Sequence, residues 1–151
     1  MEENEATERI RYAVEKFSDP DVYYQVMLAS SPEIAKDTIE TLPGVKELIE
    51  LGPEGGKAAL NLLEDETYAA NDNIASIALY VVEQAPPPGA KETLARLITS
   101  NKFHGINSQL AAETFLHSAG IESLEEKAID TAAREADRIQ AETMNSENKQ
   151  A

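Results

Sequence analysis

Glu113 and His117 have the spacing in this chain that most directly suggests chemistry, because they stand four positions apart in a predicted helix. Residues at this spacing share one helix face. Glu83 lies 34 positions before His117, and a repeat of that length would place the two at equivalent points on neighbouring helices. Together they could form a metal or acid–base cluster, although zinc sites generally use three or four protein ligands. A polar, hydrogen-bonded helix surface without chemistry is the commoner outcome.

Tyrosines are the second group of candidate binding residues, since tyrosine is enriched at interface hot spots. Tyr68 and Tyr80 could form a recognition stripe together with Tyr23 and Tyr24. Tyr80 also falls within an apolar run, so a partly buried role is equally open. His104 stands at a predicted loop-to-helix junction, where a capping or surface role is more common than partner binding.

Asn73 and Asn107 are polar residues near the starts of two predicted helices, 34 positions apart. They could belong to a polar ladder along one edge of a repeat array. Helix N-capping explains several of the polar residues beside them equally well. The two asparagines therefore remain candidates for partner binding.

Motifs of catalysis are scarce. Gly55-Gly56-Lys57 lacks the spacing of a phosphate-binding loop and the Ser or Thr that follows its lysine. The chain has no cysteine, which removes disulfides, thiolate metal sites and thiol nucleophiles together. We therefore expect a protein that is not an enzyme, with no catalytic residue, no metal and no cofactor.

The elements that must position these residues repeat along the chain. Three series of apolar residues share a step of 34 positions, and Gly52, Pro86 and Gly120 follow the same step. The three series are Val26–Leu60–Leu94, Leu48–Val82–Leu116 and Ala29–Leu63–Leu97. Self-similarity at such a period is typical of a helical solenoid, in which each unit buries its apolar face against its neighbours.

Apolar periodicity and helix breakers predict the individual helices. They are expected over residues 3–17, from Pro20, from Pro32 to about Leu42, over 45–51, 53–63, 70–84, 89–99 and 105–118, and from Ser123. Pro43-Gly44 leaves open whether 33–51 is one kinked helix or two. Ser123 and Glu126 fit a capping box for the last helix. Its apolar face comprises Leu124, Ala128, Ala132, Ala136 and Ile139.

This pattern predicts a single domain over residues 1–142. A cap helix at 3–17 precedes repeats over 18–120, and a second cap helix occupies 121–142. Residues 143–151 are polar and are expected to form a flexible tail.

The segment from Gly52-Pro53 through Leu60, Leu63 and Asp65 to Ala75 and Ala78 resembles a HEAT-like, armadillo-type helical repeat. The resemblance covers roughly residues 18–120 and implies an all-α, right-handed α–α superhelix of about seven or eight helices. Its second helices would line a concave surface. One departure is Ala70-Asn71, which stands where such repeats usually carry Val-Arg.

Charge narrows the class of partner. The chain has 28 acidic and 13 basic residues, a net charge of −15, and such a surface repels phosphate backbones. Residues 18–66 hold 11 acids and 3 bases, whereas residues 67–120 hold 4 and 3. Solubility, a basic protein partner or a salt-rich cytoplasm could each explain the acidity.

Without a secretory signal at its start or an apolar run of membrane-spanning length, the chain is expected to be cytoplasmic.

The resemblance implies a non-catalytic scaffold or adaptor that binds another protein, with a basic protein as one candidate. The concave face would contact the partner through Tyr68, Asn73, Tyr80, Glu83, Asn107, Glu113 and His117. Two alternatives stay open. One is a small-ligand or metal-binding accessory protein of an enzyme system. The other is a nucleic-acid-binding HEAT module, which the acidity disfavours unless Lys57, Lys91, Arg96 and Lys102 form a local patch.

Overall fold

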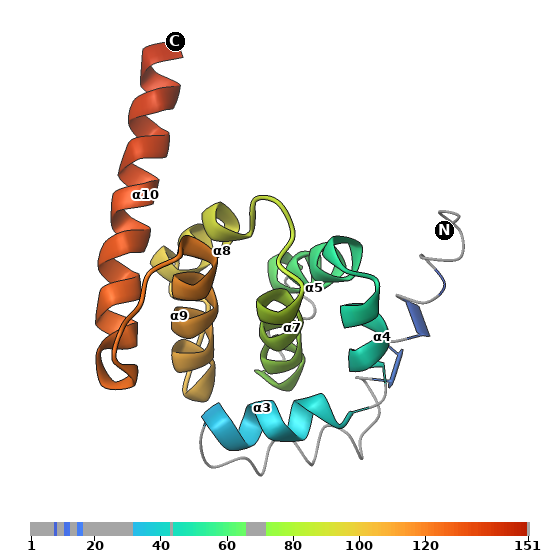
Figure 1. Cartoon of the computed structure of the whole chain (residues 1–151). Helices are drawn as coiled ribbons and strands as arrows, with labels where there is room; N and C mark the ends of the chain where they lie inside the picture. Colours follow the sequence, from blue (N-terminus) through green and yellow to red (C-terminus); the bar gives the residue numbers. More distant parts are fainter. Residues whose placement is uncertain are drawn as a thin grey trace. The chain divides into compact units, whose positions relative to one another are not determined.

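The computed structural model describes residues 8, 11–12, 15–16, 32–42, 44–65 and 72–150. Across these ranges the chain is helical, with turns between helices and no strand, which confirms the all-α prediction (Figure 1). Seven α-helices and one 3-10 helix lie within them. They are α3 (Pro32–Glu40), α4 (Val45–Glu50), α5 (Pro53–Glu64), α7 (Asp72–Gln84), α8 (Ala90–Thr99), α9 (Ile106–Ala119), η1 (Glu125–Lys127) and α10 (Ala128–Gln150).

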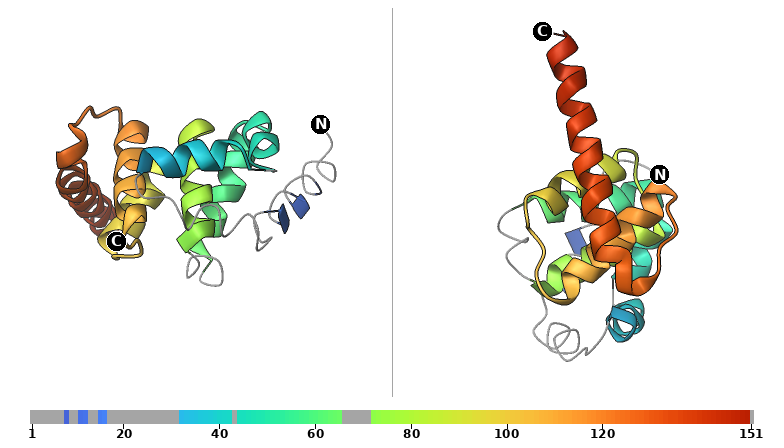
Figure 2. Two further views of the ribbon diagram at one scale, coloured as in Figure 1. Left: turned by 90° about the horizontal axis from the view of Figure 1, so that it is seen from below. Right: turned by 90° about the vertical axis from the view of Figure 1, so that its left-hand side faces the viewer.

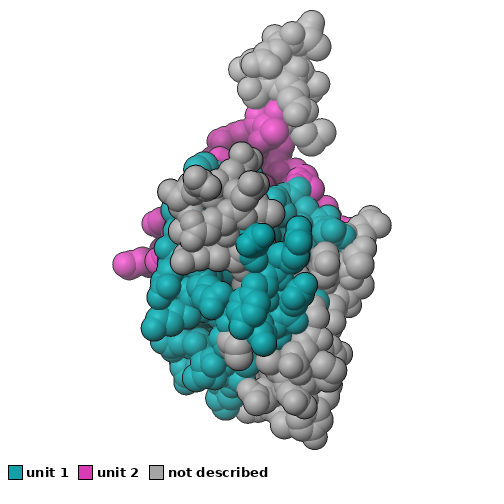
Figure 3. All heavy atoms as spheres, turned by 90° about the vertical axis from the view of Figure 1, so that its right-hand side faces the viewer, with its two compact units in different colours: residues 1–88 teal, residues 89–151 magenta. Residues whose placement is uncertain are grey.

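Two compact units divide the chain, residues 1–88 and residues 89–151 (Figure 3). Each unit is described by itself, and the single domain predicted over residues 1–142 stays a prediction. Of the helix predicted for residues 3–17, the five described residues are all helical. The helix predicted from Pro20 lies outside the described residues, as does Tyr68.

Helix α7 is the centre of the first unit. It packs against α5 and α4, and α3 lies against it as well (Figures 1 and 2). Each residue from Ile74 to Val82 is buried, including the residues predicted for the apolar face. A helix that is apolar on nearly all sides must be covered on all of them. The prediction that Leu60, Leu62 and Leu63 end the preceding helix is confirmed, since α5 ends at Glu64. Leu60 and Leu63 are buried, and Leu62 is half-buried.

Proline and glycine set the helix boundaries, much as predicted. Pro32 is the first residue of α3, where its missing N–H would have no helical partner. The open question over residues 33–51 is resolved as two helices, because α3 ends at Glu40 and α4 begins at Val45 after Gly44 with a φ of 89°. Helix α7 ends at Gln84, before the three prolines at 86–88.

The Gly55-Gly56 pair lets the start of α5 approach other backbone segments. A Cβ atom on Gly55 would lie 1.8 Å from the carbonyl oxygen of Leu48, and one on Gly56 would lie 1.7 Å from that of Ala85. Both distances are far inside van der Waals contact, so no larger residue fits without movement. Close helix packing therefore accounts for a dipeptide that in sequence resembled a fragment of a phosphate loop.

Helices α8, α9 and α10 form the second unit (Figure 2). Leu94 and Phe115 are fully buried, and Leu110 and Leu116 nearly so. Gly120 ends α9 in the left-handed conformation, with φ 71°. The Ile121 N–H donates to the Leu116 carbonyl at 2.9 Å, as in a Schellman motif. This confirms the predicted helix stop.

Helix α10 confirms part of its prediction and corrects the rest. Ala128, Ala132, Ala136 and Ile139 are buried as predicted. Leu124 is 62% exposed, because it precedes the 3-10 turn and is not on the helical stripe. Ser123 is not the N-cap of α10, since the regular helix begins only at Ala128 and the Ser123 hydroxyl lies 3.2 Å from the Leu124 carbonyl oxygen.

The end of α10 also differs from the polar tail predicted over residues 143–151. The helix continues through Gln150 and extends beyond α8 and α9 (Figure 1). No glycine or proline follows Gly120, so nothing in the sequence breaks the helix.

Candidate functional site

Tyr80 and Glu83 lie on the side of α7 that α3 covers. Lys36 of α3 reaches Glu83, with 3.3 Å between Nζ and Oε2, and the two side chains are 27% and 18% exposed. Tyr80 is 8% exposed. Two residues predicted to contact a partner therefore face an internal helix–helix contact in the first unit.

Burial and acidic neighbours shape the electrostatics of this contact. Burial raises the pKa of Tyr80, and the carboxylates of Glu40 and Glu83 raise it further, while Lys36 opposes them. Glu83 Oε2 is buried without a hydrogen bond of good geometry, so Lys36 neutralises it as an ion pair rather than by an aligned hydrogen bond. Because both side chains retain some solvent contact, we expect the pair to contribute about 1 kcal/mol or less to stability.

Sequence reasoning did not find Lys36. The residue lies 47 positions before Glu83 and outside the 34-residue step. The signal that could have found it is weak: Lys36 is the one basic residue between positions 18 and 45.

Glu113 and His117 lie together on α9 of the second unit, as their spacing predicts. Gln109 donates from Nε2 to Glu113 Oε1 at 3.2 Å. His117 is exposed in the last turn, where a histidine side chain also suits the helix dipole. Among the predicted binding residues whose exposure is described, His117 is exposed, and Glu113 is half-buried, as Glu83 is.

Asn73 and Asn107 are each the second residue of their helices, α7 and α9. The 34-residue equivalence of the two positions is thus present in the helix boundaries. Asn107 is 3% exposed, which places it inside the second unit rather than on a polar ladder at the surface. His104 is exposed in the loop before α9.

The hypothesised metal cluster finds no support. Glu83 belongs to the first unit, and Glu113 and His117 belong to the second. Among the residues that the structure describes, no group of three or more histidine, aspartate or glutamate side chains is placed to hold a metal ion. Of the residues considered for a basic patch, Lys57 belongs to the first unit and Lys91, Arg96 and Lys102 belong to the second.

Sequence reasoning also missed a pocket in the second unit, between α8, α9 and α10. Its volume is about 140 Å³. It is lined by Ile98, Asn101, Phe103, Ser108, Ala111, Ala112, Ile129, Ala132 and Ala133. Cofactor and small-molecule sites usually occupy about 300–1,000 Å³, whereas a cavity of about 150 Å³ holds one benzene-sized group. The pocket therefore has room for a single side chain.

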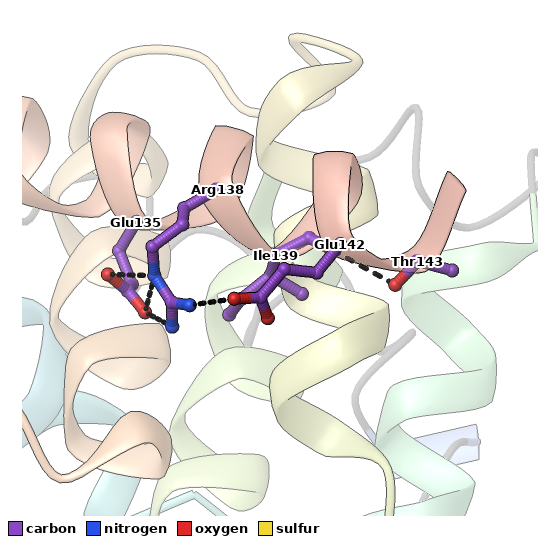
Figure 4. A network of polar contacts seen from close by, with 5 residues as sticks. All are labelled: Glu135, Arg138, Ile139, Glu142 and Thr143. Atoms are coloured by element: carbon purple, nitrogen blue, oxygen red, sulfur yellow. Dashed lines mark hydrogen bonds and ion pairs between the residues drawn. The ribbon is translucent and has the colours of Figure 1, made fainter. Parts of the chain in front are cut away.

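The exposed side of α10 is charged. Arg138 lies between Glu135 and Glu142, donating from Nε to the Glu135 carboxylate at 3.0 and 3.1 Å and pairing with Glu142 (Figure 4). The hydrogen bond from Arg138 lowers the pKa of Glu135, and the same bond raises the pKa of Arg138. Exposed pairs such as these add little stability. A charged outer face is typical of a helix that ends a repeat array.

No helix within the described ranges is both long and apolar enough to cross a membrane.

Comparison with known proteins adds no family. No protein-family model, no curated protein and no solved structure shows a significant match to this chain. The resemblance to HEAT-like repeats therefore depends on the residues of the chain itself.

Proposed function

We propose that this chain is a non-catalytic protein-binding scaffold or adaptor, built as a right-handed HEAT-like α-solenoid. The observation that carries the proposal is the equivalence of two helical hairpins, α5–α7 and α8–α9. Shifted by 34 positions, α7 covers residues 106–118, and α9 spans Ile106–Ala119. Arrays of such hairpins usually hold another macromolecule along their second helices, an inference from fold that gives the class of function and not the partner.

Equivalent positions of the two hairpins are buried alike. Leu60 and Leu94 are 5% and 0% exposed, Leu63 and Leu97 are both 4%, and Val82 and Leu116 are 0% and 3%. Burial of the same positions in successive units is what a stacked repeat requires.

The alternative of a small-ligand or metal site is less well supported. The pocket of about 140 Å³ is smaller than such sites usually are, and the residues proposed for metal binding are not gathered into a cluster. Net acidity favours a basic protein over a nucleic acid as the partner, because complementary charge speeds encounter. We also propose a cytoplasmic location for the protein.

The proposed contact surface centres on α9. Glu113 is half-buried and His117 is exposed, so both can reach a partner. Tyr80 and Asn107 are buried, and in this proposal they support the helices that carry the surface.

The experiment is affinity capture with the full chain at low and moderate salt, using reversible cross-linking. The double variant Glu113→Ala/His117→Ala is compared with Glu92→Ala/His104→Ala, which removes the same two residue types from exposed positions of the same unit. We expect one partner to be retained by the wild type and the control, and retention to fall at least about tenfold in the first variant.

Two outcomes would contradict the proposal. The first is the absence of any specific partner at either salt concentration. The second is stoichiometric metal in untagged protein that is lost on His117→Ala, which would support the accessory-protein alternative.

A further inference from the structure

The pocket of the second unit is built from small side chains contributed by two helices. Ala111 and Ala112 of α9 and Ala132 of α10 are each no more than 2% exposed and line its walls. Ala133 of α10 also lines the pocket and is exposed. Because alanine side chains are small, these walls leave space in the pocket that a larger side chain would fill.

Comparison with the first unit explains where the space comes from. Ser108 and Ala111 stand 34 positions after Ile74 and Ile77, which are 7% and 0% exposed. The second unit therefore has a hydroxyl and a methyl group where the first has two isoleucine side chains. The Ser108 hydroxyl is engaged by the Phe103 carbonyl oxygen at 3.2 Å, so it does not make the pocket hydrophilic.

The exposed lining of the pocket combines apolar side chains with Asn101. Ile129 lines the pocket and is 50% exposed, and Phe103 beside it is half-buried. Leaving a large apolar side chain half in water forgoes burial free energy. An apolar group that entered the pocket would cover both side chains.

The shape and charge of the surface restrict the occupant. No strand is present in the described ranges, so they offer no sheet edge to which an extended peptide could add, whereas an amphipathic helix satisfies its own backbone and inserts only side chains. The exposed charges next to Ile129 are of both signs, namely Glu126, Lys127 and Asp130, and Asp130 is paired with Arg134. The net charge of −15 attracts a basic partner over a longer range.

We propose that this pocket holds one apolar side chain from a basic amphipathic helix of a partner protein. The proposal rests on the protein-binding function above and names the chemistry of the partner. A leucine- or phenylalanine-sized group enters between α9 and α10 and contacts Ile129 and the alanine walls, and the net charge of the chain, −15, favours basic residues beside it.

The test uses the full chain and three synthetic helical peptides of about 18 residues, long enough to be helical in isolation. The first has a single central leucine in an alanine and lysine background, the second replaces that leucine by alanine, and the third replaces the lysines by glutamates. Methyl NMR of Ala111, Ala112 and Ala132 reports occupation of the pocket. We expect the first peptide to shift these methyl signals and to bind at least about tenfold more tightly than either of the others.

Matched variants of α10 locate the binding. Ala133→Phe fills the pocket from its exposed rim, and Ala141→Phe places the same ring at another exposed alanine of the same helix. We expect the first to weaken the leucine peptide at least about tenfold and the second to leave it unchanged. Ile129→Lys and Leu124→Lys form a second pair, with Leu124 as the control outside the pocket.

The pocket proposal is overturned if the leucine peptide leaves the alanine methyl signals unmoved. It is also overturned if Ala133→Phe binds the peptide as the wild type does, or if the glutamate peptide binds equally well. Its failure is separable from failure of the proposed function. If a captured partner binds Ala133→Phe and Ala141→Phe equally, the pocket proposal fails and the scaffold proposal stands. If the peptide binds but no partner is captured, the scaffold proposal fails and the pocket proposal stands.

Discussion

The hairpins α5–α7 and α8–α9 bury equivalent positions with different residues, and the differences lie where each hairpin meets its neighbours. At the start of the first helix, Gly56 of the first hairpin corresponds to Ala90 of the second. A methyl group on Gly56 would overlap the carbonyl oxygen of Ala85, whereas Ala90 is 3% exposed and its methyl group is accommodated. The first hairpin is therefore the more tightly packed at this end.

Along the second helix of each hairpin, the two hairpins differ in side-chain volume. Ile77 of α7 corresponds to Ala111 of α9, and Ala111 lines the pocket of the second unit. Two hairpins can thus bury equivalent positions while one of them leaves room for an external group. Positions that are buried alike in both hairpins define the fold, and positions that differ between the hairpins are where function is to be sought.

Introducing a carboxylate at a position that is buried in both hairpins should cause the largest loss of stability. Val82→Asp and Leu116→Asp each bury an unpaired charge at equivalent positions that are 0% and 3% exposed. We expect each to cost more than about 4 kcal/mol, enough to unfold the hairpin that carries it. Hydrogen exchange with mass spectrometry should show protection lost in α5 and α7 for the first variant and in α8 and α9 for the second.

Asn61→Asp is the control for this pair, since it adds the same carboxylate at an exposed position of α5. Its effect should stay within about 0.5 kcal/mol. Full protection of α7 in Val82→Asp would mean that the buried face assigned to this helix is wrong.

Many helix boundaries and buried positions could be predicted from the sequence, because apolar periodicity and prolines act locally. The boundaries of α5, α8 and α9 lie within two residues of those predicted, and the buried stripe of α10 from Ala128 to Ile139 was predicted correctly. Leu124 was assigned to that stripe wrongly, since periodicity alone does not reveal where a 3-10 turn gives way to regular helix.

The candidate site was harder to predict, because it depends on contacts distant in sequence. The Lys36–Glu83 ion pair joins two helices outside the repeat step, and the burial of Tyr80 depends on the same contact. The change from Ile77 to Ala111 is visible at the 34-residue step of the sequence, but the pocket also depends on how α8 and α10 pack beside α9, which the step does not predict.

Exchanging glycine and alanine between the hairpins tests the difference in packing. Gly56→Ala should cost about 3 kcal/mol, because the new methyl group would sit 1.7 Å from the Ala85 carbonyl oxygen and must displace backbone. The reverse change at the equivalent position, Ala90→Gly, should cost only about 1 kcal/mol through lost helix propensity. Urea unfolding followed by circular dichroism measures both, and equal losses would show that the two helix starts are packed alike.

The smallest predicted effect concerns a position where the hairpins differ in chemistry, Tyr80 in the first and Thr114 in the second. Burial, with Glu40 and Glu83, raises the pKa of Tyr80 above 10.0. Below that pH both folded and unfolded chains keep the phenolic proton. Above it the unfolded chain loses the proton first, so this contribution to stability is lost as the pH rises through the folded pKa.

Tyr80→Phe should therefore lose less stability than the wild type between about pH 9 and pH 11. Urea unfolding at several pH values would measure the difference. Tyr12→Phe, at a tyrosine that is 48% exposed, should leave the pH dependence unchanged. Because the effect arises from one phenol, we expect about 1 kcal/mol at most. Parallel pH profiles for the wild type and Tyr80→Phe would mean that α3 does not hold this ring away from water, and Tyr80 would then be accessible to a partner.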